Sequence, residues 1–294
     1  MARFGRSTAA GGTPTAPPGR AAHKGRAHNG RMAFNAWLAA AATAAAFMTL
    51  LWLVSLALRD SSIVDSFWGV GFVVIAAAAA AASPAGPAAL APRAYLIGAL
   101  VAVWGLRLSH YIFWRNRGKG EDYRYRKWRE QAGPSWWWRS FFKVFLLQGV
   151  VMWLVAAPIV AAIAAPERRP IGWLDLAGVA VWLTGFLFEA VGDWQLARFK
   201  ADPANKGRLF TGGVWRYTRH PNYFGDAAVW WGHYIVAAAA GAWWTVFSPA
   251  LMTFLLVRVS GVSMLEAALR DSKPGYREYV ETTSAFFPRP PRRP

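Results

Sequence analysis

The stretch RYTRHPNYFGDAAVWWGHYIVAAAA, residues 216–240, joins a dense polar and aromatic cluster directly to an apolar run. Proline suits the first turn of a helix, because its missing N–H is not needed there. The residue before a proline avoids the α region of backbone space, so His220 marks a boundary. We therefore expect a membrane-spanning helix that begins at about Pro221 and presents a polar N-terminal end to one membrane surface.

The rest of the chain repeats this apolar pattern. Of its 294 residues 55% are hydrophobic, with 18 Trp and no Cys. Trp and Tyr gather where a membrane meets water, and the lack of Cys excludes disulfides, iron–sulfur clusters and Cys-based zinc sites. Apolar runs close to the about 20 residues that a spanning helix needs occupy 34–58, 63–82, 94–114, 140–165, 171–192, 224–247 and 249–269. The sequence predicts an all-α polytopic membrane protein with about seven transmembrane helices.

Residues 1–31 differ from the rest, being rich in Gly, Pro, Ala, Ser, Thr and Arg. Such a composition cannot bury a core, so we expect a disordered basic N-terminal tail. Residues 32–294 are expected to form a single transmembrane domain. The tail would carry its positive charge to the side opposite the other basic segments, so we expect translation to begin at Met32 in the cell.

The net charge of +18 arises mainly in segments between apolar runs. The loops 115–139 and 193–223 and the tail after 269 hold most of the Lys and Arg, and seven spans place all three on one side. The positive-inside rule makes that side cytoplasmic. The same distribution explains the charge without a nucleic-acid partner.

Several charged residues lie inside apolar runs, where each costs roughly 2.5–3.5 kcal/mol on insertion scales. They are Asp65, Arg107, Lys143, Glu189, Asp193, Arg258 and Glu266. Glu189 and Asp193 share one helical face at i and i+4, so they either pair with arginines for packing or form a polar pocket open to the cytoplasm. Lys143 is expected to snorkel to the interface. EDYRYRKWRE, residues 121–130, is expected to be a solvated loop with surface ion pairs.

Two kinds of site are not indicated. The five histidines show no metal-ligand spacing, so we predict no metal. Gly69 and Gly71 lack the third glycine of a dinucleotide fingerprint and lie inside an apolar run rather than after a strand. We therefore expect no Rossmann domain.

The approach to Pro221 has the chemistry of an anion site. A helix N-terminus presents free N–H groups and the positive end of the helix dipole. Arg216 and Arg219 stand beside it, and further basic residues precede them in the chain. The pattern predicts a site for a phosphate or carboxylate at the membrane surface, with a lipid-headgroup anchor as the alternative.

Six motifs together resemble the steroid 5α-reductase superfamily, and most closely its bacterial, mostly uncharacterised branch. They are WGLRLSHYIFWR (104–115), EDYRYRKWR (121–129), FEAVGDWQLARFK (188–200), GGVWRYTRHPNYFGD (212–226), SGVSMLE (260–266) and YREYVETTSAFFP (276–288). The resemblance covers roughly residues 35–288. It implies a seven-span reductase of the bacterial inner membrane that uses NADPH, with a substrate-side half at about 32–165 and a cofactor-binding half at about 166–294.

The resemblance also implies individual residues. The expected cofactor-binding residues, including Arg216 from the basic approach, are Glu189, Asp193, Lys200, Arg216, Arg219, His220, Asn222, Tyr223, Asp226, Arg258, Tyr276 and Tyr279. Members of the superfamily usually carry Glu where this chain has Asp226. The expected catalytic residues are Tyr111 and Asp65, the latter as the nearest carboxylate to the substrate-binding Glu of steroid-reducing members.

Three functions remain open at this point. The resemblance implies NADPH-dependent reduction of a C=C bond conjugated to a carbonyl in a sterol-like, isoprenoid or fatty-acyl substrate, with Tyr111 hydrogen-bonded to the carbonyl oxygen. Isoprenylcysteine and phospholipid methyltransferases share a related Arg-His-Pro-x-Tyr block and would bind S-adenosylmethionine at the same place. The third is a non-catalytic protein that binds membrane lipids.

Overall fold

The computed structural model describes residues 18–83, 90–165, 170–259, 262, 266 and 273–292, with side chains from residue 34 onward. Within these ranges the regular structure is helical throughout, with no strand. The α-helices are α1 (Pro18–Leu58), α2 (Ile63–Ala81), α3 (Pro92–Asn116), α4 (Tyr123–Ala132), α5 (Trp136–Ser140), α6 (Leu147–Val155), α7 (Ala157–Ile163), α8 (Trp173–Ala201), α9 (Pro221–Ala239), α10 (Phe247–Phe254) and α12 (Tyr276–Thr282). Two π-helical segments continue neighbouring α-helices, η3 (Phe141–Leu146) before α6 and η7 (Leu255–Val259) after α10.

The helices confirm an all-α polytopic membrane protein. In the described part of the chain, five helical stretches are long and apolar enough to cross a membrane: Phe34–Leu58, Ile63–Ala81, Pro92–Asn116, Tyr123–Val155 and Trp173–Ala201. The two other expected spans correspond to α9, whose 19 residues begin with a polar turn, and to the shorter apolar stretch Trp243–Val259. The predicted helix start at Pro221 is confirmed.

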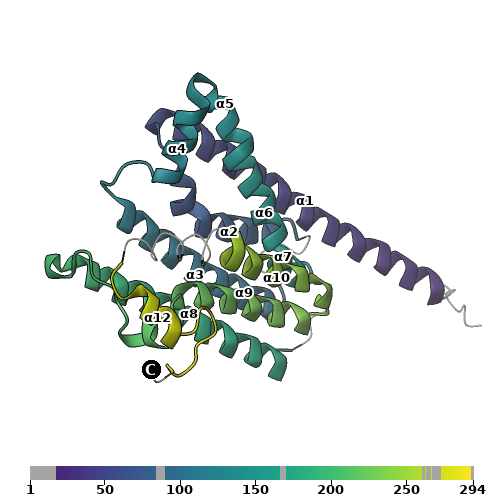
Figure 1. Ribbon diagram of the computed structural model, residues 1–294. Coiled ribbons are helices and arrows are strands. Elements are labelled where there is room, and N and C mark those ends of the chain that lie inside the picture. Colours follow the sequence, from purple (N-terminus) through teal and green to yellow (C-terminus); the bar gives the residue numbers. More distant parts are fainter. Residues whose placement is uncertain are drawn as a thin grey trace, which may run out of the picture.

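The N-terminal expectation needs correction. Helix α1 already begins at Pro18, so the tail that we expected to be disordered over 1–31 is helical from Pro18 onward. Residues 1–17 lie outside the described residues. In Figure 1, α1 is the long helix that extends past the remaining helices at its N-terminal end.

Glycines allow close packing in two helix pairs, α2 with α3 and α8 with α9. A Cβ on Gly69 of α2 would lie 2.1 Å from the carbonyl oxygen of Gly105 on α3. A Cβ on Gly225 of α9 would lie 2.4 Å from the backbone nitrogen of Glu189 on α8. Small residues allow such backbone contact between membrane helices. Gly69 therefore has a packing role, and Gly225 allows α9 to lie directly against the segment of α8 that carries Glu189.

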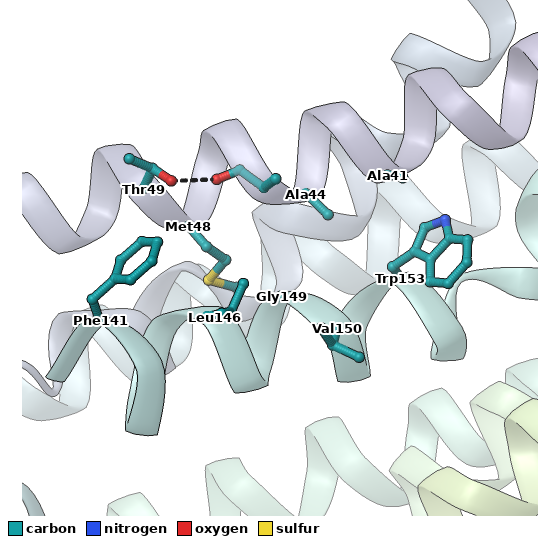
Figure 2. A pocket seen from close by; sticks show the side chains of 10 residues that line it. Ala41, Ala44, Met48, Thr49, Phe141, Leu146, Gly149, Val150 and Trp153 are labelled. Carbon is teal, nitrogen blue, oxygen red and sulfur yellow. Dashed lines mark hydrogen bonds between the residues drawn. The ribbon is translucent and has the colours of Figure 1, made fainter. Parts of the chain in front are cut away.

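A shallow apolar groove of about 150 Å³ lies between α1 and the η3–α6 segment. Figure 2 shows Met48 of α1 pointing toward Leu146, with Phe141 at one end of the groove and Trp153 at the other, near Ala41. The Thr49 hydroxyl donates to the carbonyl oxygen of Ala45 at 2.7 Å, so its polar group is satisfied within α1. The groove therefore offers van der Waals contact and no chemistry.

Candidate functional site

A larger cavity of about 430 Å³ lies where α2, α3, α4, η3–α6, α8, α9 and α10–η7 meet. One wall is polar and comes mainly from α3, α8 and α9, whereas Val144, Leu147 and Val151 with Met252 and Leu256 form an apolar wall. The volume falls in the range of about 300–1,000 Å³ that is usual for small-molecule sites. The cavity is the candidate functional site.

The polar wall is built around the two carboxylates that share a face of α8. Arg107 of α3 reaches both, at 2.8 Å to Glu189 Oε1 and 2.6 Å to Asp193 Oδ2. The Trp104 indole N–H donates to Glu189 Oε2 at 2.9 Å. The two carboxylate side chains are 3% and 6% exposed. The carboxylates are therefore paired with an arginine and also line the cavity, and the opening of this pocket to the cytoplasm stays a prediction.

The first turn of α9 continues this wall. The Asn222 side-chain amide donates to Asp193 Oδ1 at 3.2 Å, and its own oxygen accepts the Tyr223 backbone N–H at 3.1 Å. Asp226 lies one turn further along, and its Oδ1 atom is buried without a hydrogen-bond partner. Buried polar atoms are nearly always satisfied, so this acceptor is suited to an N–H or O–H donor of a bound molecule.

Tyr111 of α3 lines the cavity beside the polar wall. Its hydroxyl donates to the backbone carbonyl of Asp193 at 3.3 Å. The guanidinium groups of Arg107 and Arg115 lie 5.3 and 5.6 Å from its ring centroid. Two cations beside one ring are within cation–π range, and they favour hydrogen-bond donation by this phenol.

A second polar cluster reaches the cavity from α2 and α4. Asp65 Oδ2 lies 3.0 Å from Arg124, and Asp65 Oδ1 accepts the Tyr125 hydroxyl at 2.7 Å. Gln148 of α6 donates to the same hydroxyl oxygen at 3.3 Å. The expectation that residues 121–130 form a solvated loop is wrong, because most of them fold as α4, with Asp122 capping the Arg124 N–H at 3.0 Å.

The turn before α4 is fixed to the start of α2 by a carboxylate. Glu121 Oε1 accepts the Ser61 backbone N–H at 2.7 Å and pairs with Arg129 at 2.8 Å. Burial on its own would raise the pKa of Glu121, but the hydrogen bonds from Arg129 and Ser61 hold that pKa below its usual value. The ionised form of Glu121 therefore stabilises this junction.

Seven predicted site residues line the cavity: Asp65, Tyr111, Glu189, Asp193, Asn222, Tyr223 and Asp226. The structure brings the two predicted catalytic residues to the same space as five predicted cofactor residues. They come from α2, α3, α8 and α9, so both expected halves of the domain contribute.

Arg219 and His220 lie beside the cavity and contact a different partner. Arg219 pairs with Glu266 at 2.7 Å, and His220 Nε2 lies 3.3 Å from the same carboxylate oxygen. Arg219 also donates to the carbonyl oxygens of Val280, at 3.1 Å, and Thr283. These bonds anchor the C-terminal segment, so most of the guanidinium that we expected to meet a phosphate is occupied within the protein.

The remaining predicted residues do not line the cavity. Tyr276 and Tyr279 are buried with ring centroids 6.2 Å apart, and the Tyr279 hydroxyl donates to the Trp215 carbonyl. Lys200, Arg216 and Arg258 are exposed. Their assignments to the cofactor stay predictions.

Lys200 nevertheless belongs to a basic cluster at the end of α8. Arg115, Lys119 and Lys273 are close enough to repel it electrostatically. Arg115 also lines the cavity, beside Tyr111. These four residues are called the basic cluster below, and Arg115 connects the cluster to the cavity.

Several residues that line the cavity or pair with its carboxylates were missing from the predicted site. Arg107 was recognised as a costly charge, but no pattern indicated which carboxylates it pairs with. Arg124 and Tyr125 lie in a charged segment without apolar periodicity. Lys143, which was expected to snorkel to the interface, is exposed and lines the cavity, with the ammonium 4.3 Å from the Trp128 ring centroid; the snorkelling itself stays a prediction. Among the described residues, no group of three or more His, Asp or Glu could hold a metal ion.

Comparison of the sequence with known proteins assigns the chain to a family. A family model described as "Protein of unknown function (DUF1295)" matches residues 51–283. A relative from Schizosaccharomyces pombe, "Uncharacterized protein C594.04c", is 27% identical over 266 residues, covering 82% of this chain and 76% of the relative. No solved structure gives a significant match. Since that relative is a yeast protein, the similarity reaches beyond bacteria, and the bacterial branch stays a prediction.

Proposed function

The chain belongs to the DUF1295 family, and from that premise we propose that it is a membrane-embedded, NADPH-dependent reductase of the steroid 5α-reductase type. Its substrate would be a lipophilic molecule with a C=C bond conjugated to a carbonyl. The observation that carries the proposal is the central cavity, which joins a hydrogen-bonding wall to an apolar wall and is lined by both predicted catalytic residues.

The polar wall fits the amide-bearing end of a nicotinamide cofactor. A carboxamide needs an acceptor for its N–H groups, and the buried Oδ1 of Asp226 is an acceptor without a partner. Asn222 supplies both a donor and an acceptor one turn earlier on α9. When bound, the cofactor would supply a hydride equivalent for the substrate's β-carbon.

The phosphates of such a cofactor need cations. The basic residues near Pro221 pointed to Arg219, but most of its guanidinium is occupied by Glu266 and by backbone carbonyls. We therefore propose that the basic cluster of Arg115, Lys119, Lys200 and Lys273 meets the phosphates, together with the N-terminus of α9.

The protein's own contribution to the reaction centres on Tyr111. Its phenol would exchange its hydrogen bond to the Asp193 carbonyl for one to the substrate carbonyl oxygen as negative charge develops there. Donors placed in this way are strong in a dry site. Arg107 and Arg115 beside the ring favour that donation. Water or Tyr111 would deliver the proton to the α-carbon. Asp65 accepts the Tyr125 hydroxyl, so its proposed role is to orient this second phenol at the cavity.

One observation favours a second candidate function. Three carboxylates, Glu189, Asp193 and Asp226, line the polar wall, and only the first two pair with Arg107. A carboxylate-rich wall also suits the positively charged sulfonium of S-adenosylmethionine, as a lipid methyltransferase would require. A lipid-binding protein without catalysis would need neither ligand.

Ligand stabilisation of the detergent-purified protein separates these functions. A ligand present at 100 times its Kd adds about 2.7 kcal/mol to the stability of the folded state. We expect NADPH to raise the melting temperature and S-adenosylmethionine to leave it unchanged. The reverse result would replace the reductase with the methyltransferase, and no response to either would leave the lipid-binding function.

A matched pair of lysines tests the phosphate site. Lys200 belongs to the basic cluster, whereas Lys206 is exposed in the following turn outside it. We expect Lys200→Gln to weaken NADPH binding and Lys206→Gln to leave it near the wild-type value. Equal effects would refute the assignment of the basic cluster.

We further propose that the protein lies in the bacterial inner membrane with its C-terminus and cofactor site in the cytoplasm. The concentration of Lys and Arg in 115–139, 193–223 and the tail supports this orientation. A C-terminal green fluorescent protein fusion should fluoresce in a bacterial host, and a C-terminal alkaline phosphatase fusion should be inactive. Active phosphatase would reverse the orientation.

A further inference from the structure

Four residues that line the cavity are exposed: Arg115 from α3, Lys143 and Leu147 from η3–α6, and Val259 from η7. The last three mark a mouth between two helical segments, η3–α6 and η7. Leu147 is 57% and Val259 is 48% exposed, whereas Val144 and Leu256 deeper in the cavity are buried. Because Leu147 and Lys143 belong to the candidate span Tyr123–Val155, we infer that this mouth faces the bilayer.

Both sides of the mouth are π-helical. Phe141–Leu146 forms one side and Leu255–Val259 the other. Single π-helical turns are rare in proteins, and those that occur are often found at functional sites. Their occurrence on both sides of one opening, and next to the predicted catalytic residues, indicates that the opening serves the cavity.

Lys143 carries the charge at this mouth. Within the described residues no carboxylate lies within 4.0 Å of its ammonium, which instead sits over the Trp128 ring at 4.3 Å. Arg124, another cation of the cavity, is paired with Asp65 at 3.0 Å. An ammonium has three N–H donors, and at a membrane-facing position an uncompensated cation is costly.

We propose that the substrate of the reaction proposed above is an anionic amphiphile, and that Lys143 binds its carboxylate or phosphate at this mouth. The apolar chain would pass between η3–α6 and η7 and lie along Val144, Val151 and Met252. A neutral sterol would leave the Lys143 ammonium without a counter-charge, whereas an anionic lipid supplies one. This inference rests on the proposed function for the role of the cavity, but the binding step is independent of the cofactor.

Native mass spectrometry of the full chain without any nucleotide tests the binding step. The probes are oleate, oleyl phosphate and oleyl alcohol, which share one chain and differ in the head. We expect at least one anionic probe to bind about tenfold more tightly than the alcohol, which corresponds to about 1.4 kcal/mol. The preference between oleate and oleyl phosphate then identifies a carboxylate or a phosphate head.

Variants assign the preference to one side chain. Lys143→Gln should reduce binding of the anionic probe to the level of the alcohol, and Lys143→Arg should restore it. The matched control is Arg139→Gln, because Arg139 is exposed on the preceding turn, stacks on Trp138 at 5.4 Å and does not line the cavity. This control should retain the wild-type preference.

Two results would overturn the proposal: equal binding of alcohol and anionic probes, or a preference that survives in Lys143→Gln. Its failure is distinguishable from failure of the reductase function, because the probes are bound without nucleotide. An anionic preference without NADPH stabilisation would retain the lipid site and reject the reductase, and the opposite combination would do the reverse.

Discussion

Arg107 pairs with two buried carboxylates at once, so its removal should be among the most damaging single changes in the protein. Arg107→Leu leaves Glu189 and Asp193, now 2.8 and 2.6 Å from the guanidinium, without their cation. Breaking a buried ion pair by deleting one partner costs about 3–5 kcal/mol. At about 2–4 °C per kcal/mol, the melting temperature should fall by about 6–20 °C.

The assay is thermal unfolding of the detergent-purified protein followed by tryptophan fluorescence. The matched control is Arg198→Leu on α8, because Arg198 is exposed. Within the described part of the chain, its guanidinium contacts the Trp194 ring, 5.6 Å from the ring centroid, and forms no ion pair. An exposed cation–π contact contributes about 0.5–1 kcal/mol, so this variant should lose only a few degrees.

A triple variant separates charge from packing. Arg107→Leu combined with Glu189→Gln and Asp193→Asn removes both orphaned charges and leaves neutral amides, which cost less to bury than unpaired carboxylates. Part of the lost melting temperature should therefore return. If Arg107→Leu melts like Arg198→Leu, or if the triple variant stays as unstable as Arg107→Leu, the carboxylates do not depend on this cation.

Three further changes probe packing, pH dependence and chemistry. Gly225→Ala places a methyl group 2.4 Å from the Glu189 nitrogen and should cost about 1–3 kcal/mol in a melting assay, whereas Gly98→Ala, which meets nothing within 4 Å, should not destabilise; equal melting would refute the close contact. The folded-state pKa of Glu121 is lowered, so the stabilisation that its ionised form provides is fully present above its unfolded pKa of about 4.3. That stabilisation is lost as the pH falls through the folded-state pKa, so the melting temperature of the wild type should approach that of Glu121→Gln in acid. A constant difference between the two melting temperatures at all pH values would contradict this. Tyr111→Phe should lower kcat for enone reduction about 10²–10³-fold with little change in KM for NADPH, and an unchanged kcat would remove Tyr111 from catalysis.

The spans and the start of α9 could be predicted from the sequence because both depend on local signals. Hydropathy alone located Phe34–Leu58, and proline stereochemistry alone located Pro221. Helix α4 has no such signal. Its residues YRYRKWREQA are mostly charged, and contacts with Asp65 and Ser61, some 60 positions earlier, hold it in place.

Many residues of the site could be predicted from the sequence, but the ion pairs and hydrogen bonds between them could not. Helical spacing placed Glu189 and Asp193 on one face, yet spacing cannot identify the arginine that faces them across a helix interface. The same limit applies to Arg219, which a local reading assigns to a ligand because Glu266 and the Thr283 carbonyl are remote in sequence. Charge at a membrane surface indicates that a partner exists, and only the packing identifies it.

The π-helical segment Phe141–Leu146 has a consequence for register. A π-turn accommodates one residue more than an α-turn, so deletion of one residue there should convert η3 to α-helix. The deletion would rotate everything before it by about 100° relative to α6. Arg124 and Tyr125 would then turn away from Asp65 while Leu147 kept its place. The π-helical turn, together with the break at Gly133–Ser135 between α4 and α5, thus lets the stretch Tyr123–Val155 present two different faces to the same cavity.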